Sequence, residues 1–472
     1  MAHQNDFRML IGGELISAAA TFDVVNPANE QVIARAPDAS QADLDKAVAA
    51  ARAAFPAWAA TSIEERKAKL NELAAAIMGS ADALKRLLTA EQGKPLGDAE
   101  FEVMGSAMWL QGAAMLDLPV TINEDTAERY SETRHVPIGV VGAIAPWNFP
   151  MVLAMFKLGP ALLAGNTVVL KPSPFTPLTT LKFAELAASI LPPGVLNVIT
   201  GGDQLGPWMT SHPGFDKISF TGSTQTGRRV MASAAATLKR VTLELGGNDP
   251  AIVMPDADVE KVAEKLFWAA FLNNGQICIA TKRLYVHKDI YEPLKNALVA
   301  YAKTVKVGDG AEPGTQIGPI NNRQQYARVL GLIQDAKDKG YTFLVGGEKL
   351  EGPGYFIPIT IIDNPPESSR IVQEEQFGPV LPLIKFDDFD DVVARANGTE
   401  YGLAASVWGK DEDKAFDLAR RIASGTVWVN ETQHLSPLAA FGGMKQSGVG
   451  VEGGVEGLLE YTNAQTLVRK RG

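Results

Sequence analysis

The sequence is poor in cysteine, because Cys278 is the only one among 472 residues. A lone cysteine excludes an intrachain disulfide framework and a cysteine-built metal cluster. Histidine is scarce as well, with five scattered residues: His3, His135, His212, His287 and His434. No two of them stand at the spacing of a metal-binding pair, so the sequence predicts no metal site.

Long apolar runs are also missing. The most apolar region, residues 151–165, is interrupted by Lys157 and Pro160 and is shorter than the roughly 20 residues that a membrane-spanning helix needs. The N-terminal residues Met-Ala-His-Gln-Asn-Asp have no basic head before an apolar core, so no signal peptide is expected. Both observations favour a soluble cytoplasmic protein without a membrane partner.

An excess of positive charge is lacking too. The 44 lysines and arginines are outnumbered by 54 aspartates and glutamates, which gives a formal net charge of −10. Such a balance argues against nucleic acid or an anionic membrane as the main partner. The hydrophobic content of 46% is that of a globular protein, and 472 residues are too many for one core. Two or three domains are therefore expected.

Apolar runs of strand length recur in the first half of the chain: residues 139–145, 167–170, 196–199, 217–220 and 240–243. Helical stretches lie between most of them, and this alternation predicts a parallel, doubly wound sheet. In such sheets ligands bind beyond the carboxyl ends of the strands. A second α/β set is expected after Asn248, with helices near 258–272, 289–304 and 321–339 and strands near 283–287, 380–386, 403–408 and 425–430.

The N-terminal region reads as two short strands followed by two helices. The strands are expected near 9–11 and 22–25. Capping-box pairs open the helices: Ser40 with Asp43, and Thr61 with Glu64.

A β-arm is expected from 121 to 135, where the sequence is charged and rich in turn residues. The segment is either a solvated hairpin or an arm that adds strands to another subunit. The tail, 459–471, alternates weakly and reads as an edge strand.

Cys278 stands in the segment Asn-Asn-Gly-Gln-Ile-Cys-Ile-Ala, residues 273–280. Most single cysteines are small buried hydrophobes, and that interpretation would hold for the segment alone. A thiolate is also the best nucleophile that a side chain offers. The polar motifs upstream favour the second interpretation.

Two strand ends carry side chains suited to acyl chemistry. Asn148 lies between prolines and aromatics in residues 146–150, a stiff setting for an oxyanion-hole amide, although it could instead satisfy local backbone. Glu244 ends an apolar strand before two glycines. Partial desolvation there would raise its pKa and suit a general base, and the alternative is a structural ion pair.

Other strand ends suit a dinucleotide. Residues 220–227 run from a strand into a helix through small residues, where free N–H groups favour a pyrophosphate, although an ordinary tight turn is the alternative. Lys171 could hold ribose hydroxyls or a phosphate, or be a solvated lysine. Glu375 could bind a ribose through its carboxylate while Phe377 packs on a flat ring of the ligand. The alternative is a turn with a core phenylalanine.

Taken together, these motifs resemble the aldehyde dehydrogenase superfamily from about residue 8 to the tail. The resemblance rests on the order and spacing of six segments: 146–150, 220–227, 243–247, 275–278, 374–379 and 441–448. It implies NAD(P)-dependent oxidation of an aldehyde to an acid, with Cys278 as nucleophile, Glu244 as base and Asn148 in the oxyanion hole. It also implies cofactor contacts from Ile144, Ala145, Pro146, Trp147, Lys171, Ser173, Gly222, Ser223, Gly227, Leu245, Glu375 and Phe377.

The resemblance further implies an aldehyde dehydrogenase-like α/β fold in three parts. A Rossmann-type NAD(P)-binding domain would comprise residues 1–117 and 138–246, and an α/β catalytic domain residues 247–448. The oligomerisation arm and tail, 118–137 and 449–472, would join subunits into a homodimer or homotetramer.

One position departs from the family pattern. Many relatives that strongly prefer NAD place a glutamate where Pro174 stands. Proline neither binds ribose hydroxyls nor repels a 2′-phosphate, so with Lys171 nearby the sequence favours relaxed use of NAD and NADP.

The substrate channel implied by the resemblance is apolar, with six lining residues: Leu153, Phe156, Ile277, Ile279, Leu435 and Phe441. None is basic, which favours an uncharged aliphatic or aromatic aldehyde, unless these positions are partly core. Two other functions stay open, a CoA-acylating reaction and a silent dinucleotide-binding relative. Retention of Glu244 argues against the CoA-acylating reaction, and joint retention of Cys278, Glu244 and Asn148 argues against the silent relative.

Overall fold

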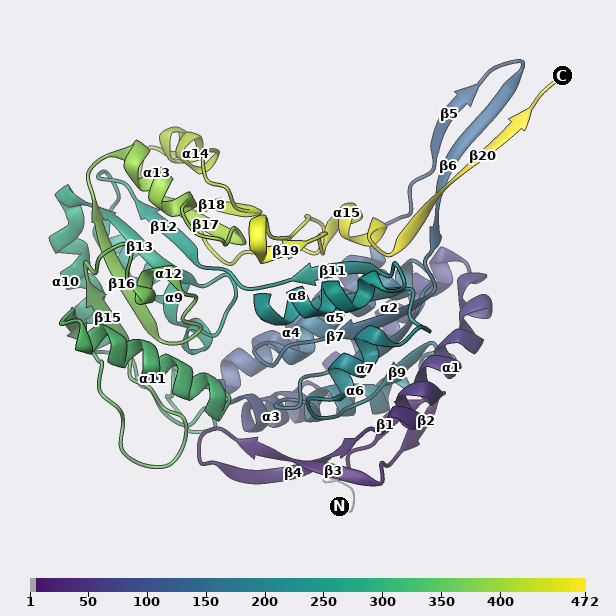
Figure 1. The fold of residues 1–472 in the computed structure, drawn as a ribbon, viewed down its shortest axis with the longest axis horizontal. Coiled ribbons are helices and arrows are strands. Elements are labelled where there is room, and N and C mark those ends of the chain that lie inside the picture. Colours follow the sequence, from purple (N-terminus) through teal and green to yellow (C-terminus); the bar gives the residue numbers. More distant parts are fainter. Residues whose placement is uncertain (1–5) are drawn as a thin grey trace.

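The computed structural model describes residues 6–472. Residues 1–5, which include His3 and most of the segment that lacks a signal-peptide pattern, lie outside the described residues. The described chain forms two α/β bodies, each built on its own sheet, and an arm that projects from one of them (Figure 1). Within residues 6–472, no helix has the length and apolar character needed to cross a membrane.

The first body is built on an eight-stranded sheet with the order β19-β11-β10-β7-β8-β9-β1-β2. Its strands are β1 (Met9–Ile11), β2 (Glu14–Ile16), β7 (Val140–Ile144), β8 (Thr167–Lys171), β9 (Leu196–Val198), β10 (Lys217–Thr221), β11 (Arg240–Glu244) and β19 (Gly448–Val449). Strands β7 to β11 pair in parallel, whereas β1, β2 and β19 pair antiparallel at the margins. The predicted doubly wound sheet is confirmed.

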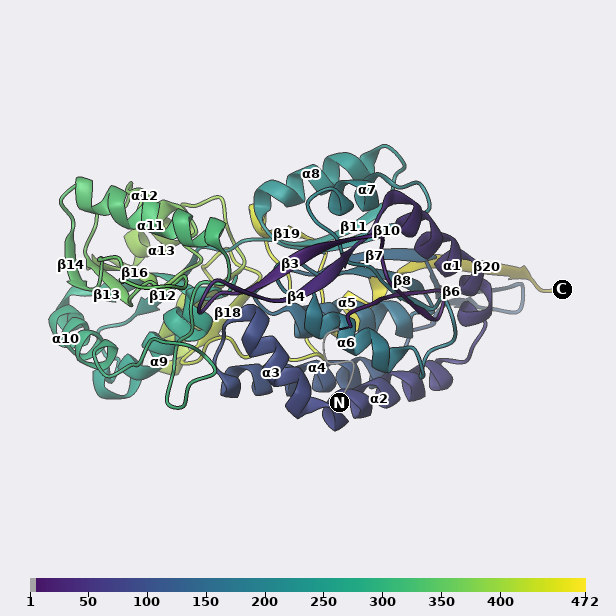
Figure 2. The ribbon, with the colours of Figure 1, turned by 90° about the horizontal axis from the view of Figure 1, so that it is seen from below.

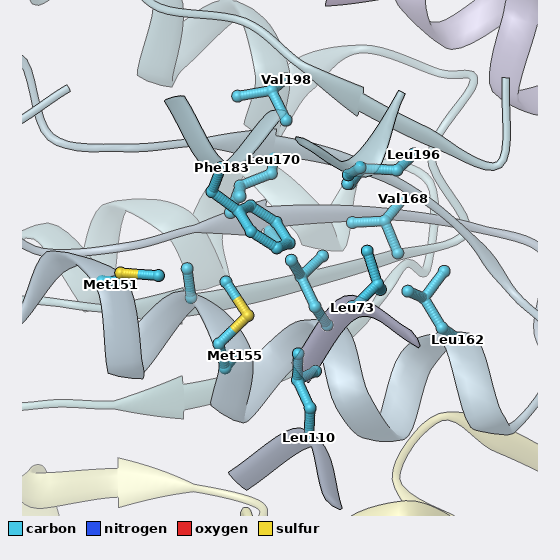
Figure 3. Packing of buried hydrophobic residues seen from close by; sticks show 14 of the residues in the cluster. Leu73, Leu110, Met151, Met155, Leu162, Val168, Leu170, Phe183, Leu196 and Val198 are labelled. Carbon is cyan, nitrogen blue, oxygen red and sulfur yellow. The ribbon is translucent and has the colours of Figure 1, made fainter. Parts of the chain in front are cut away.

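Helices cover both faces of this sheet, as Figure 2 shows from below. They are α1 (Gln41–Ala59), α2 (Ile63–Gly79), α3 (Ala81–Gln92), α4 (Leu96–Ala114), α5 (Pro150–Leu163), α6 (Leu178–Ala187), α7 (Leu205–Ser211) and α8 (Thr224–Ala235). Figure 3 shows the core between helices and sheet, a single cluster that includes Leu110, Met155, Leu170 and Phe183. These side chains are fully buried, so the sheet is held rigidly beneath its loops.

The start of α1 confirms the predicted capping box, because Ser40 and Asp43 bond reciprocally. The predicted cap of the next helix is wrong by one residue. Ser62 caps α2 by accepting from the backbone N–H of Glu65 at 3.1 Å. The hydroxyl of Thr61 instead donates to the Trp58 carbonyl at 2.7 Å and closes the end of α1.

The hairpin of β3 (Ala20–Asn26) and β4 (Gln31–Asp38) is longer than the single strand that was expected near 22–25. Its register shifts between Val24 and Val25, and most of its residues are exposed or half-buried. A bulge in a half-exposed hairpin breaks the alternation that would mark its strands in the sequence.

The second body is built on a sheet with the order β14-β15-β16-β13-β12-β17-β18. Its strands are β12 (Asp249–Val253), β13 (Thr281–His287), β14 (Thr342–Val345), β15 (Thr360–Asp363), β16 (Val380–Phe386), β17 (Ala404–Trp408) and β18 (Thr426–Val429). Its helices are α9 (Val259–Phe271), α10 (Tyr291–Ala302), α11 (Arg323–Asp338), α12 (Arg370–Gln373), α13 (Phe389–Asn397) and α14 (Glu412–Ala419), with 3₁₀ turns η1 (Leu272–Gly275) and η2 (Lys288–Ile290).

The arm consists of β5 (Thr121–Asp125), β6 (Arg129–Pro137) and β20 (Thr462–Lys470), in the order β20-β6-β5. It extends away from both bodies (Figure 1). The predicted exposed arm and edge strand are confirmed, since β20 lies at the sheet margin and its residues from Asn463 onward are exposed.

The connection from the second body back to the arm passes the first sheet. It contains η3 (Lys445–Ser447), β19 and α15 (Gly454–Leu459). The expected domain boundary between residues 448 and 449 falls inside β19, and the division into three domains stays a prediction.

Candidate active site

Four neighbouring strands of the first sheet end at one level. In the strand register Lys171 lies beside Ile144, which lies beside Phe220, and Thr221 lies beside Glu244. The predicted cofactor and base residues of these strands therefore share one edge, where ligands of open parallel sheets bind.

The Cys278 loop enters from the second body, between η1 and β13. The expected helix ends at Phe271, after which Asn273, Asn274 and Gly275 take the left-handed conformation, with φ of 50°, 60° and 69°. A Cβ on Gly275 would lie 2.3 Å from the Gly378 carbonyl oxygen, so a glycine is required there. This turn redirects the chain toward the edge of the first sheet.

Cys278 is half-buried, and its surroundings disfavour the thiolate. Burial raises its pKa to about 12, and the carboxyl groups of Asp249, Glu375 and Glu244 act in the same direction. Lys282 opposes them. The resting side chain is therefore a thiol at neutral pH.

Asn148 is tied to the Cys278 loop by hydrogen bonds. Its Nδ2 donates to the Gln276 carbonyl at 3.0 Å, and its own carbonyl accepts from Asn273 Nδ2 at 3.1 Å. An amide nitrogen has two hydrogens, so one N–H of Asn148 remains for a ligand. The side chain is 4% exposed, which makes it a fixed donor.

A buried ion pair holds the backbone around Asn148. Lys94 Nζ lies 2.5 Å from Glu102 Oε2 and donates to the Asn148 carbonyl at 3.0 Å. Glu102 Oε1 accepts from the N–H of Met151 at 2.9 Å, at the start of α5. Sequence reasoning missed this pair, although a signal exists, because Glu102 follows a buried Ala99 on the apolar face of α4.

Glu244 is buried without a hydrogen-bond partner. Both of its carboxyl oxygens lack a protein donor within residues 6–472. Burial raises its pKa well above the ordinary value, the negative charge of Glu452 adds to this, and Lys157 opposes it. Lys157 and Glu452 form a buried ion pair at 2.7 Å, and sequence reasoning saw Lys157 only as an interruption of an apolar run.

The residues expected to bind the dinucleotide offer suitable donors. Lys171 is 6% exposed, burial lowers its pKa to about 8, and its one hydrogen bond in the described chain is a long one to the Pro172 carbonyl, 3.3 Å. Ser223 caps α8, whose N-terminus favours a phosphate. A buried lysine with unused donors and a helix N-terminus at the same sheet edge fit a ribose and a pyrophosphate.

The nicotinamide-end candidates stand closer to Cys278. Glu375 Oε1 accepts from the N–H of Gly247 at 3.0 Å and lies 3.8 Å from Lys282 Nζ. The ring of Phe377 meets that of Trp147 edge-on, with centroids 5.3 Å apart. Gly246 allows the close approach of Glu375, because a Cβ there would lie 2.4 Å from its Oε2.

The remaining cofactor candidates lie at the same edge. Ala145 and Pro146 directly follow β7, Ser173 lies two residues beyond β8, and Gly222 lies between β10 and α8. Gly227 and Leu245 meet within the fold, since a Cβ on Gly227 would lie 2.4 Å from Leu245 Cδ2. That contact packs α8 against the end of β11.

The six expected channel residues fall into two groups. Ile277, Ile279 and Phe441 form one apolar cluster, and Cys278 and Leu435 pack against it. Phe156 stacks on Trp109 with ring centroids 3.5 Å apart, and belongs with Leu153 to the core of the first body. Leu435 packs against both clusters.

No group of three or more histidine, cysteine, aspartate or glutamate side chains in the described part of the chain could hold a metal ion.

Comparison with known proteins gives consistent results. The sequence profile described as the aldehyde dehydrogenase family matches residues 16–467. A probable aldehyde dehydrogenase from a Pseudomonas species is 44% identical over 469 residues, which cover 99% of this chain and 96% of the relative. A phenylacetaldehyde dehydrogenase from Pseudomonas fluorescens is 40% identical, over 98% of this chain and 95% of the relative. The NAD+ complex structure of a Bacillus cereus aldehyde dehydrogenase matches with a TM-score of 0.97 and 38% identity, covering 99% of this chain and 97% of the other.

These matches span both sheets and the Cys278 loop. They confirm the expected fold, a Rossmann-type body joined to a second α/β body with a projecting arm. The chain belongs to the aldehyde dehydrogenase family.

Proposed function

We propose that this enzyme oxidises an uncharged aliphatic or aromatic aldehyde to the carboxylic acid through a thioester on Cys278. The observation that carries the proposal is the meeting of three groups at one sheet edge. A lone thiol lies on a loop bonded to Asn148. The Glu244 carboxyl, which has no hydrogen-bond partner among residues 6–472, is close enough to disfavour ionisation of that thiol.

In the first half of the reaction Cys278 Sγ bonds to the carbonyl carbon. Its proton must leave first, and the ionised form of Glu244 is available as acceptor because neither oxygen is engaged by the protein in the described residues. Negative charge then develops on the substrate oxygen. The free N–H of Asn148 and the backbone N–H of Cys278 are suited to stabilise it.

When bound, the dinucleotide supplies the acceptor for the hydride that leaves the substrate carbon. The acyl group then remains on Sγ as a thioester. Before the second half, Glu244 releases the proton that it took from Cys278 to solvent. It then takes a proton from water, the hydroxide adds to the acyl carbon, and the carbon–sulfur bond breaks. The acid leaves and Cys278 regains its proton.

We propose that the dinucleotide is NAD or NADP, with little preference. The matched Bacillus cereus aldehyde dehydrogenase is an NAD+ complex, which supports NAD as one of the two. In this chain Pro174, rather than a carboxylate, follows Ser173 beyond β8, so a 2′-phosphate would meet no negative side chain at that position. A measured kcat/KM ratio that favours NAD by more than about 100-fold would refute this part, and Pro174→Glu is expected to shift the ratio toward NAD.

An uncharged substrate is supported by the cluster around Cys278. Ile277, Ile279 and Phe441 are apolar and at most 7% exposed. The nearby Lys282 does not face this cluster, because its amine bonds to backbone carbonyls behind the loop. If a carboxylated semialdehyde were by far the best substrate, the proposal of an uncharged aldehyde would be refuted.

We further propose that the arm joins copies of the chain into a homodimer or homotetramer. Strand β20 lies at the arm's margin and exposes Leu467 and Val468, 39% and 63%. An edge strand with exposed apolar residues is suited to pairing with a second subunit.

The test is turnover of an aldehyde panel, measured as reduced-nicotinamide absorbance with NAD and NADP, with and without CoA, beside Cys278→Ala. Turnover without CoA that disappears in the variant is the expected result. Turnover only with CoA would assign the acylating reaction. Dinucleotide binding without turnover of any aldehyde would assign a silent binding protein.

A further inference from the structure

Lys282 places a buried ammonium directly behind the nucleophile. It is the second residue of β13, and its side chain is 3% exposed. Nζ donates to three carbonyl oxygens of the Cys278 loop, those of Ile277 at 2.8 Å, Cys278 at 2.7 Å and Ala280 at 3.3 Å. The loop therefore wraps around one cation.

This wrapping fixes the direction of the peptide groups. In a trans peptide the C=O and the following N–H point in opposite directions. Because the Ile277 carbonyl faces Lys282, the N–H of Cys278 points to the other side. Within the described chain that N–H has no backbone acceptor, so it is free for a substrate oxygen.

The charges around Lys282 and Cys278 come from several elements. Lys282 Nζ lies 3.8 Å from Glu375 Oε1, which follows α12. Asp249, at the start of β12, and Glu244, at the end of β11, also disfavour ionisation of the thiol. Among these groups Lys282 is the one that favours the thiolate.

We propose that Lys282 is a positioning residue that aims the Cys278 N–H at the substrate oxygen and stabilises negative charge on the Cys278 sulfur. The inference rests on the proposed role of Cys278. It assigns to Lys282 the cationic partner that a thiol nucleophile needs and that no histidine supplies among the described residues around Cys278.

The proposal is tested on the enzyme without dinucleotide, by the rate at which uncharged iodoacetamide alkylates Cys278. Lys282→Met removes both the charge and the donors, and is expected to slow alkylation at pH 8 by about tenfold. Lys282→Gln keeps a donor without charge and should be nearly as slow. Lys282→Arg keeps the charge and should retain most of the wild-type rate.

The matched control is Lys265→Met, an exposed lysine on α9, which should alkylate like the wild type. Peptide mass mapping assigns the alkylated residue, and thermal unfolding checks that each variant is folded. Wild-type alkylation rates in Lys282→Met, or in Lys282→Gln if Lys282→Met does not fold, would overturn the proposal. Equal slowing in Lys282→Arg would overturn its electrostatic part.

Activity separates this inference from the proposed function. Lys282→Met is expected to lower kcat about tenfold or more and to change the aldehyde KM little, since orientation of the oxyanion donor matters most in the transition state. Turnover that survives Cys278→Ala would refute the proposed function. Unchanged alkylation in the Lys282 variants would refute only the role of Lys282.

Discussion

Burial raises the pKa of the Glu244 carboxyl group, which has no hydrogen bond within the described residues. Below its raised pKa the group is an acid and cannot take a proton from water, so kcat should rise with pH through that pKa. In Glu244→Gln the rising limb should disappear, and steady-state turnover should fall by about 100-fold or more.

Rapid mixing checks this prediction, because Glu244 accepts a proton in both halves of the proposed reaction. Slow formation of reduced nicotinamide without a fast initial burst is the expected trace. Wild-type turnover in Glu244→Gln, with its pH limb intact, would contradict the role of Glu244 as base. Glu264→Gln, on the exposed face of α9, is the control.

Glu91 offers a residue-scale test of stability. It is buried, accepts the N–H groups of Leu178 and Thr179 at 2.7 and 2.8 Å, and burial raises its pKa from 4.5 to about 7. A carboxyl group with a higher pKa in the folded state stabilises the fold at low pH and loses that contribution as pH rises toward 7.

Between pH 5 and pH 8 the wild type should therefore lose roughly 2 kcal/mol of unfolding free energy that Glu91→Gln does not lose. Denaturant unfolding at the two pH values measures the difference. An identical pH dependence in both proteins would show that Glu91 titrates normally.

Sequence reasoning proposed Cys278, Glu244 and Asn148 as the reactive residues because each stands in a distinctive local motif, and their roles stay a prediction. It missed Lys94 and Lys282, whose partners are backbone carbonyls of the site loops. Nothing in a lysine's neighbours along the chain shows which carbonyl it reaches after folding. The structure was needed for those contacts.

At the scale of elements, the loop between β7 and α5 depends on a contact from the start of α4. Lys94 and Glu102 hold the Asn148 carbonyl and the first turn of α5. Lys94→Met should loosen this loop and lower kcat by about 10- to 100-fold, because small misplacements of catalytic groups are costly. Dinucleotide affinity should change little.

A double-mutant cycle checks whether Lys94 acts through Asn148. In an Asn148→Ala background the Lys94→Met substitution should have little further effect on kcat. Additive losses would instead mean that Lys94 acts elsewhere. Lys85→Met is the control, since Lys85 pairs with Asp82 at the surface of α3.

The elements that sequence reasoning located best are the strands of the two sheets. Strands such as β7 and β8 are buried on both faces and appear as largely continuous apolar runs. The β3–β4 hairpin was only partly predicted because it is half-exposed and bulged. The cap of α2 was predicted one residue too early, at Thr61, because Thr61 and Ser62 are adjacent hydroxyl residues and either could cap the helix N-terminus.

At the scale of the whole molecule, the exposed arm leads us to expect that copies of the chain assemble through it. Charges on the exposed apolar residues of β20, in Leu467→Asp/Val468→Asp, should disrupt pairing between subunits and lower the molecular mass in solution. Analytical ultracentrifugation measures the mass. An unchanged assembly would contradict the proposed role of the arm, and Met78→Asp, on the exposed end of α2, controls for surface charge.

The two sheets carry different residues of the proposed active site. Cys278 precedes β13 of the second sheet, whereas Asn148 and Glu244 follow β7 and end β11 of the first. Two hydrogen bonds join the two halves at the site, one from Asn148 Nδ2 to the Gln276 carbonyl and one from Asn273 Nδ2 to the Asn148 carbonyl. Activity therefore reports the alignment of the two bodies more sensitively than secondary structure does. In a denaturant titration, turnover should therefore be lost at a concentration where the helical circular dichroism is still intact, because the two bodies lose their alignment before either one unfolds.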